Sequence, residues 1–225
     1  MADDLERFYE LLCDLETGLG GSKIISECHG HQKWPFRGVY FFLDPDESCE
    51  LGPGGIRVVR VGTHALKAGS NSTLWRRLRT HKGTLAGFGD HRASVFRRHV
   101  GQALMVSSPS KYEVSTWDGT RPKTAKALAH ESQLEHAVSE YIGSLRLLWI
   151  AVPDSIGSSD DRAYLEKNAI GLLAEAGTLP SHHWLGHSSP NPAITMSGLW
   201  NVSHVTAGCD PDFFARFQRF VKLTA

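Results

Sequence analysis

Gly38-Val-Tyr-Phe-Phe-Leu43 and, shortly after it, Ile56-Arg-Val-Val-Arg-Val-Gly62 are two runs of β-branched and aromatic residues. Asp44-Pro-Asp-Glu47 and Gly52-Pro-Gly-Gly55 stand between them, and such Pro/Gly clusters favour turns. The two runs therefore predict a β-hairpin. A third apolar run, Leu147–Val152, predicts a buried strand farther along the chain.

Apolar residues at helical spacing surround these strands. They predict helices over about 3–17, 73–81, 94–105, 134–142, 160–175 and 210–222. Ser72 or Thr73 is a candidate cap for the second helix and Asp210 for the last, whereas 176–200 reads as a loop. The chain has no repeat and no linker long enough to divide it. It predicts a single α+β domain over 1–225, in which helices cover a small sheet.

Composition and charge exclude several classes of protein. The 24 Lys/Arg balance 24 Asp/Glu, which argues against a uniformly basic surface. The four cysteines are dispersed and form no CxxC pair. The first residues lack the pattern of a signal peptide, and the most apolar run, Leu145–Pro153, is too short to span a bilayer. We expect a soluble, cytoplasmic protein that does not bind membranes.

Positive charge is concentrated between residues 71 and 100. This stretch holds one acid, Asp90, and seven basic residues: Arg76, Arg77, Arg79, Lys82, Arg92, Arg97 and Arg98. A neutral protein that gathers its cations in this way has a local anion site, for which a polyphosphate backbone is the usual partner. A solvated helix face is the alternative interpretation. Arg77 and His81 are four residues apart, so both project from one face of the predicted helix.

Glu166 is the most informative carboxylate. On the predicted helix 160–175 it shares a face with Ala163, Ala169 and Ile170. An acid on an apolar face requires a cation, a metal or a proton, because burial of an unpaired charge is too costly. An internal pair with an arginine is the alternative to a metal.

The ordered set of these motifs resembles the GIY-YIG nuclease superfamily. Gly38-Val-Tyr40 resembles the GIY strand, Arg60-Val-Gly62 the YIG strand, and Leu74-x-x-Arg77-x-x-x-His81 the helix that carries Arg and His. Glu166 follows on a later helix, and the matching segments cover roughly a quarter of the chain. The resemblance implies a mainly antiparallel three-stranded sheet flanked by helices. The nuclease core would span about 36–175, with helices 3–17 and 210–222 as additions.

The resemblance also implies an activity, the hydrolysis of DNA phosphodiester bonds with one divalent metal, Mg²⁺ or Mn²⁺. Tyr40 would orient or activate the attacking water, Arg77 would bind the phosphate with His81 beside it, and Glu166 would hold the metal. The expected partner is double-stranded DNA. The remaining basic residues of the cluster would contact its backbone: Arg76, Arg79, Lys82, Arg92, Arg97 and Arg98.

One departure from the family pattern concerns the second tyrosine. Arg60 occupies its position, and Arg60, with His64 nearby, could supply a cation that favours the Tyr40 phenolate. The same departure fits a family member that binds DNA without cutting it. The downstream Asn of the family corresponds to Asn201, with Asn191 as a competitor that reads more readily as a turn residue before proline.

Other interpretations have less support. Cys28-His29-Gly-His31 has a metal-like density of ligands, but no second Cys/His pair stands at zinc-finger spacing. His182-His183 in a Ser/Pro-rich loop reads as a solvated pair. A small-molecule phosphoesterase could use a Tyr, an Arg and a metal, but the basic cluster is wider than one phosphate needs.

Overall fold

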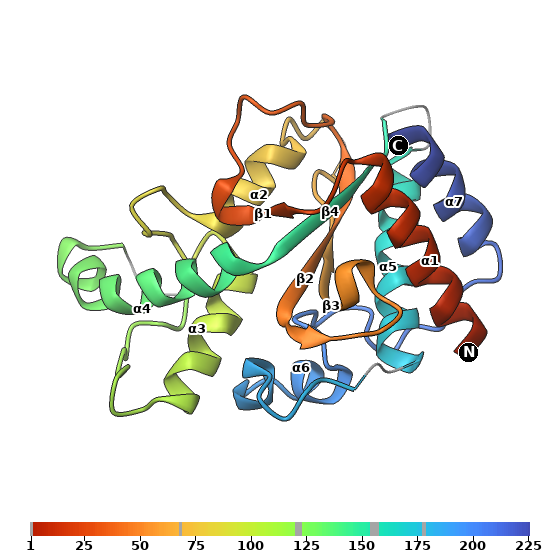
Figure 1. Ribbon diagram of the computed structural model, residues 1–225. Coiled ribbons are helices and arrows are strands. Elements are labelled where there is room, and N and C mark those ends of the chain that lie inside the picture. The colour runs from red at the N-terminus through yellow and green to blue at the C-terminus, as the bar shows by residue number, and fades with distance from the viewer. Residues whose placement is uncertain (1, 68, 120–122, 154–157, 177–178) are drawn as a thin grey trace.

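The computed structural model describes residues 2–67, 69–119, 123–153, 158–176 and 179–225 (Figure 1). Its longer helices are α1 (Ala2–Gly18), α2 (Leu74–Lys82), α3 (Val95–Ser107), α4 (Ala125–Ser144), α5 (Ser158–Ala176), α6 (Pro192–Ser197) and α7 (Phe213–Thr224). Short 3-10 turns are η1 (Ile25–Glu27), η2 (Pro53–Gly55) and η3 (Leu185–Ser188). The strands are β1 (Lys23–Ile24), β2 (Gly38–Ser48), β3 (Ile56–Gly62) and β4 (Arg146–Ala151).

The predicted hairpin forms and lies at one side of a four-stranded sheet. The strand order is β1-β4-β2-β3, and every neighbouring pair is antiparallel. Tyr40 faces Gly62 across the hairpin and Trp149 on its other side. The α+β class with a small antiparallel sheet is confirmed, but the predicted number of three strands is wrong. Two residues in β1 are too few to produce an alternating pattern in the sequence.

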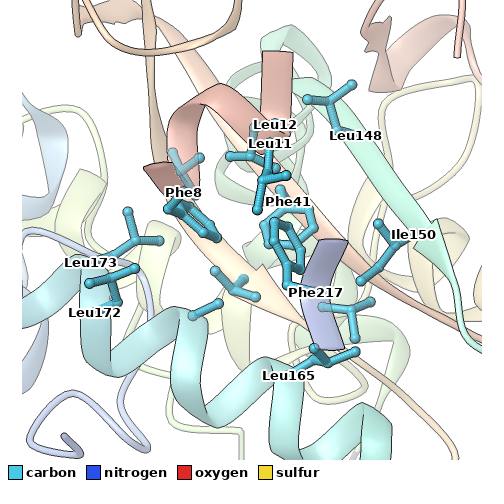
Figure 2. Close-up of a cluster of buried hydrophobic side chains, with 14 of the residues drawn as sticks. Phe8, Leu11, Leu12, Phe41, Leu148, Ile150, Leu165, Leu172, Leu173 and Phe217 are labelled. Carbon is cyan, nitrogen blue, oxygen red and sulfur yellow. The ribbon is translucent and has the colours of Figure 1, made fainter. Parts of the chain in front are cut away.

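Helices cover both faces of the sheet, with α1, α5 and α7 on one side and α2, α3 and α4 on the other (Figure 1). Side chains of β2 alternate accordingly. Phe41 and Leu43 join the first core, in which Phe8 of α1 stacks on Phe217 of α7 with ring centroids 5.3 Å apart (Figure 2). Tyr40 and Phe42 join the second core. The alternation therefore places the Tyr40 phenol on the side of α2.

Local capping accounts for several helix boundaries. Thr73 accepts a hydrogen bond from the Arg76 N–H at 3.1 Å, so it is the cap of α2, as predicted. Asp210 does not cap α7, because its Oδ1 accepts from the Asp212 N–H in the turn before the helix. Part of the predicted loop 176–200 is helical, and Asn191 caps α6. No helix among the described residues is long and apolar enough to cross a membrane.

The segment 198–201 protects the outer edge of β3. The Trp200 N–H donates to the Val59 carbonyl at 2.7 Å, which mimics a further strand. Asn201 continues the pattern with its side chain, since its Oδ1 accepts from the Val61 N–H at 3.0 Å and its Nδ2 donates to the Val61 carbonyl at 2.8 Å. The exposed edge of a sheet needs such partners. The amide therefore fixes the end of β3, next to Gly62.

Candidate active site

Gly62 and Gly38 stand where neighbouring atoms of the sheet leave no room for a side chain. A Cβ atom on Gly62 would lie 2.2 Å from Tyr40 Oη and 2.3 Å from its Cζ, whereas ordinary contact requires 3.4–4 Å. A Cβ atom on Gly38 would lie 2.4 Å from the Ile150 carbonyl oxygen of β4. Gly62 therefore leaves room for the ring, and Gly38 allows the close approach of β2 and β4.

His81, in the last turn of α2, is the hydrogen-bond partner of this phenol. Its Nε2 lies 2.7 Å from Tyr40 Oη, and both side chains are fully buried. Burial, and then the positive charges of Arg77, Arg60 and Arg97, lower the pKa of His81 well below its usual value. The imidazole is therefore neutral near pH 7 and carries a single ring N–H.

Arg60 and Arg77 bring two guanidinium groups to the same region, one from β3 and one from α2. The charge of each acts on both His81 and Glu166. The Nε atoms of both arginines are buried and have no hydrogen-bond partner among the described residues. Buried donors are normally paired, and these two N–H groups are left without an acceptor among the described residues.

Contacts with Trp200 and Phe96 fix the position of the Arg60 side chain. Its Nη1 donates to the Trp200 carbonyl at 2.5 Å, and its guanidinium lies over the Phe96 ring, 4.7 Å from the centroid. Arg60 faces the same side of the hairpin as Tyr40, because it is paired with Phe42. The residue that replaces the second family tyrosine is thus a fixed cation on the phenol side of the sheet.

Glu166 reaches the end of β3 from α5. Its Oε1 accepts from the Thr63 N–H at 3.1 Å, and Thr63 Oγ1 donates to the Gly38 carbonyl at 2.9 Å. Burial raises the pKa of Glu166, although Arg60, the Thr63 hydrogen bond and Arg77 act in the opposite direction. Oε2 has no hydrogen bond to any residue that the structure describes. A desolvated carboxylate with one oxygen available fits a hard divalent cation that keeps much of its water.

His64 lies at the same end of β3 and is neutral. Its Nδ1 donates to the Ser72 carbonyl at 3.1 Å, so the buried Nε2 is a lone pair, and no described residue binds it. Burial, followed by the charges of Arg37 and Arg162, lowers the pKa of His64 to about 4. This low pKa argues against a positive charge on His64, so the predicted cation beside Tyr40 depends on Arg60. A buried imidazole surrounded by arginines loses its proton.

Arg37 and Arg162 are two cations of this site that the sequence analysis missed. Arg37 donates to the Ser70 carbonyl at 2.6 Å and also to the Ser72 carbonyl. Arg162, one turn before Glu166 on α5, donates to the Ala65 carbonyl at 3.2 Å. Each lies outside the basic stretch, and only the shared face of Arg162 and Glu166 could have indicated one of them from the sequence.

Asn201 belongs to the framework of the site. Both ends of its amide bind the Val61 backbone, and the side chain is 5% exposed. The geometry gives no support to the predicted catalytic contact, because the amide's function is to complete the edge of β3.

The basic stretch separates into buried and exposed members. Arg97 is fully buried, and its Nη2 lies 2.5 Å from Glu135 Oε2 of α4. Arg92 forms two hydrogen bonds to Glu131, at 2.8 and 2.7 Å. The predicted contact with DNA is wrong for Arg97, because its guanidinium is enclosed by protein. For Arg92 it is replaced by an internal ion pair.

Lys82 also has an internal function. Its Nζ donates to the Ser26 carbonyl at 2.6 Å and to the Cys28 carbonyl at 2.5 Å, and the side chain is 7% exposed. It therefore ties α2 to the N-terminal segment and does not present a charge to DNA, contrary to the prediction. Arg76 and Arg79 are exposed on α2, and Arg98 is half-buried on α3. These three remain candidates for contact with a phosphate backbone.

Asp90, His91 and Glu135 form a second group with the spacing of metal ligands, since their ligand atoms lie within 4.8 Å of one another. Basic side chains already neutralise the two carboxylates of this group. Glu135 binds Arg97, and Asp90 Oδ2 lies 3.0 Å from Lys123 Nζ. A metal would have to displace these cations, so the group is better explained as an ion-pair network that joins α3 to α4.

Comparison with known proteins identifies the family of the chain. A family model described as a GIY-YIG domain matches residues 1–225. The chain belongs to the GIY-YIG family. It is therefore a member of a nuclease-type family whose members generally use divalent metals and act on DNA. No curated protein and no solved structure matches the chain.

Proposed function

We propose that this GIY-YIG protein is a metal-dependent endonuclease that hydrolyses the phosphodiester bonds of double-stranded DNA. The observation that carries the proposal is the convergence of two arginines, Arg60 and Arg77, on a desolvated carboxylate and on the imidazole that contacts a buried phenol. Both residues are half-buried, and the charge of each acts on Glu166 and on His81. A bridging phosphate offers anionic oxygens to both guanidinium groups, which are the side chains best suited to it.

Each side chain then has a role in the hydrolysis. Arg77 and Arg60 bind the phosphate oxygens and stabilise the charge that builds up on them. Tyr40 orients the attacking water and takes its proton, so that the new P–O bond forms as the bond to the leaving deoxyribose oxygen breaks. Gly62 and His81 hold the phenol in position. Burial excludes competing water and strengthens these charge interactions.

Glu166 would hold the metal, Mg²⁺ or Mn²⁺, with water and phosphate oxygen completing the coordination. When bound, the cation supplies Lewis-acid stabilisation of the phosphate and leaving oxygens. Neutral His64 presents a lone pair on Nε2 at the same end of β3, where it could accept a hydrogen bond from the attacking water. The four free cysteines suit a reducing compartment, which supports action in the cytoplasm.

The experiment that tests the proposal is a plasmid-nicking assay with Glu166→Gln. The amide keeps the shape of the side chain but loses its charge, so nicking in Mg²⁺ should be abolished, while DNA affinity in EDTA should change little. Glu175→Gln provides a matched control, because Glu175 is exposed on the same helix. Cleavage by Glu166→Gln at the wild-type rate would refute the assignment.

A second function is favoured by one observation. Arg60 occupies the place of the family's second phenol and is tied to the Trp200 carbonyl. A protein with this substitution could bind DNA without cutting it. If the wild-type protein binds DNA but cuts nothing in Mg²⁺ or Mn²⁺, this non-cleaving function replaces the nuclease.

A further inference from the structure

A buried chain of polar side chains extends from the candidate active site to the start of α3. Tyr40 Oη lies 2.7 Å from His81 Nε2, and His81 Nδ1 lies 2.8 Å from Ser94 Oγ. All three side chains are fully enclosed by protein. Ser94 was not among the predicted site residues, since a serine before an apolar run indicates only a helix cap.

The start of α3 holds His81 at two points. Ser94 Oγ contacts the imidazole and also accepts the Arg97 N–H at 3.2 Å, as a helix cap does. Arg97 Nη1 donates to the His81 carbonyl at 2.8 Å, while Glu135 fixes the guanidinium from α4. The imidazole therefore cannot turn without disturbing two helices.

The number of hydrogens restricts the arrangement of this chain. The phenol, the neutral imidazole and the serine hydroxyl carry one hydrogen each, but only two contacts join them. One hydroxyl hydrogen must point elsewhere. If His81 Nδ1 carried the hydrogen, Ser94 would accept two N–H groups, and its own hydrogen would be buried with no other acceptor among the described residues. If Nε2 carries it, the spare hydrogen is the one on Tyr40, and this is the hydrogen that is absent when the phenol is a phenolate, so both contacts are then satisfied.

We propose that Ser94 is a positioning residue that donates its hydroxyl hydrogen to His81 Nδ1 and so fixes the Nε2–H tautomer of the imidazole. His81 then donates to the Tyr40 oxygen. This bond becomes stronger when the oxygen is negatively charged, which suits the phenolate that the proposed hydrolysis requires. The burial that keeps His81 uncharged supports a single fixed tautomer.

The inference rests on the proposed function for its role in the reaction. Tyr40, as phenolate, takes a proton from the attacking water while the water oxygen bonds to phosphorus. The leaving deoxyribose oxygen departs with the electrons of the broken P–O bond and takes a proton from solvent. His81 keeps its Nε2–H throughout as a donor to the Tyr40 oxygen, and it is not the base that receives the proton.

The tautomer can be measured directly in the full-length protein by NMR with ¹⁵N-labelled histidine. The His81 signals are assigned by their loss in His81→Gln. We expect the Nε2–H form in the wild type and in Ser94→Thr, which keeps a hydroxyl, and a mixture of forms in Ser94→Ala. Thr124→Ala removes the equivalent cap from α4, where Thr124 accepts the Ala127 N–H, and should leave the His81 signals unchanged.

Activity provides a second readout. Nicking by Ser94→Ala should fall, by less than the roughly 10²–10⁴-fold attributable to a whole acid–base group. Ser94→Thr should restore it, and Thr124→Ala should retain it. A wild-type Nδ1–H tautomer, or a Ser94→Ala tautomer equal to that of the wild type, would overturn the inference. If the wild type cuts no DNA, the proposed function fails, but the tautomer still decides the role of Ser94.

Discussion

Gly62→Ala is the smallest change that should separate the phenol from its partner. The added Cβ would lie 2.2 Å from Tyr40 Oη, about 1.2–1.8 Å inside ordinary contact, and 2.3 Å from Cζ. The ring cannot retreat freely, because it is fully buried and packed against Phe42 with centroids 5.3 Å apart. Such overpacking typically costs about 1–3 kcal/mol. A displacement of the order of 1 Å at a reacting group can lower the rate about 10²-fold.

The assay combines urea unfolding with plasmid nicking. Gly208→Ala is the matched control, because a Cβ there meets nothing within 4 Å, and it should retain both stability and rate. Gly62→Ala should lose about 1–3 kcal/mol of unfolding free energy, and its nicking rate should fall by far more than its folded fraction. Wild-type stability and rate in Gly62→Ala would show that Tyr40 does not depend on the missing side chain, and the reasoning would be refuted.

Three other variants test the assignments around the site. Arg97→Ala should cost about 3–5 kcal/mol, because it removes the cation that is paired with the buried Glu135 carboxylate. Burial raises the pKa of Glu135, but hydrogen bonds from His91 and the charge of Arg97 hold it below its usual value. The stability from this ion pair is therefore present at neutral pH and is lost as the pH falls through the pKa of the folded state. Urea unfolding that gave equal losses for Arg97→Ala at pH 7 and in acid would contradict the ion pair. The double variant Arg76→Ala, Arg79→Ala should weaken DNA binding. The slope of log affinity against log salt should become shallower by about 0.9 per lost contact. An unchanged slope would show that both side chains are only solvated. Asn201→Ala should lose about 1–3 kcal/mol through its two hydrogen bonds, and a loss of nicking at unchanged stability would instead indicate a catalytic amide.

Local patterns in the sequence were sufficient for most helices and strands. The hairpin and the helices of Arg77 and Glu166 follow from periodicity, because alternation and helical spacing are properties of neighbouring residues. The resemblance selected Tyr40, Arg77 and Glu166, and the structure brings their elements together at the end of β3. The two-residue strand β1 was missed because it is too short to show a period.

The sequence could not determine which basic side chains are exposed to a ligand and which are paired inside the protein. Arg97 and Arg76 both lie in the basic stretch, yet one is enclosed by Glu135 and the other is exposed on α2. Their fates depend on partners that are far away in the chain, since Glu135 is 38 residues from Arg97. Local charge density records the residue type but not the partner.

By itself, the sequence determined the α+β class, the hairpin and the membership of the two motif strands in a nuclease-like pattern, because each depends on residues close together in the chain. Tertiary structure alone decided that Ser94 contacts His81 and that Arg37 and Arg162 surround His64. The tertiary structure also decided that the Asn201 side chain binds the backbone at the edge of β3. The physical reason is that hydrogen bonds and desolvation act through space, and the groups that they couple here lie up to 140 residues apart in the chain.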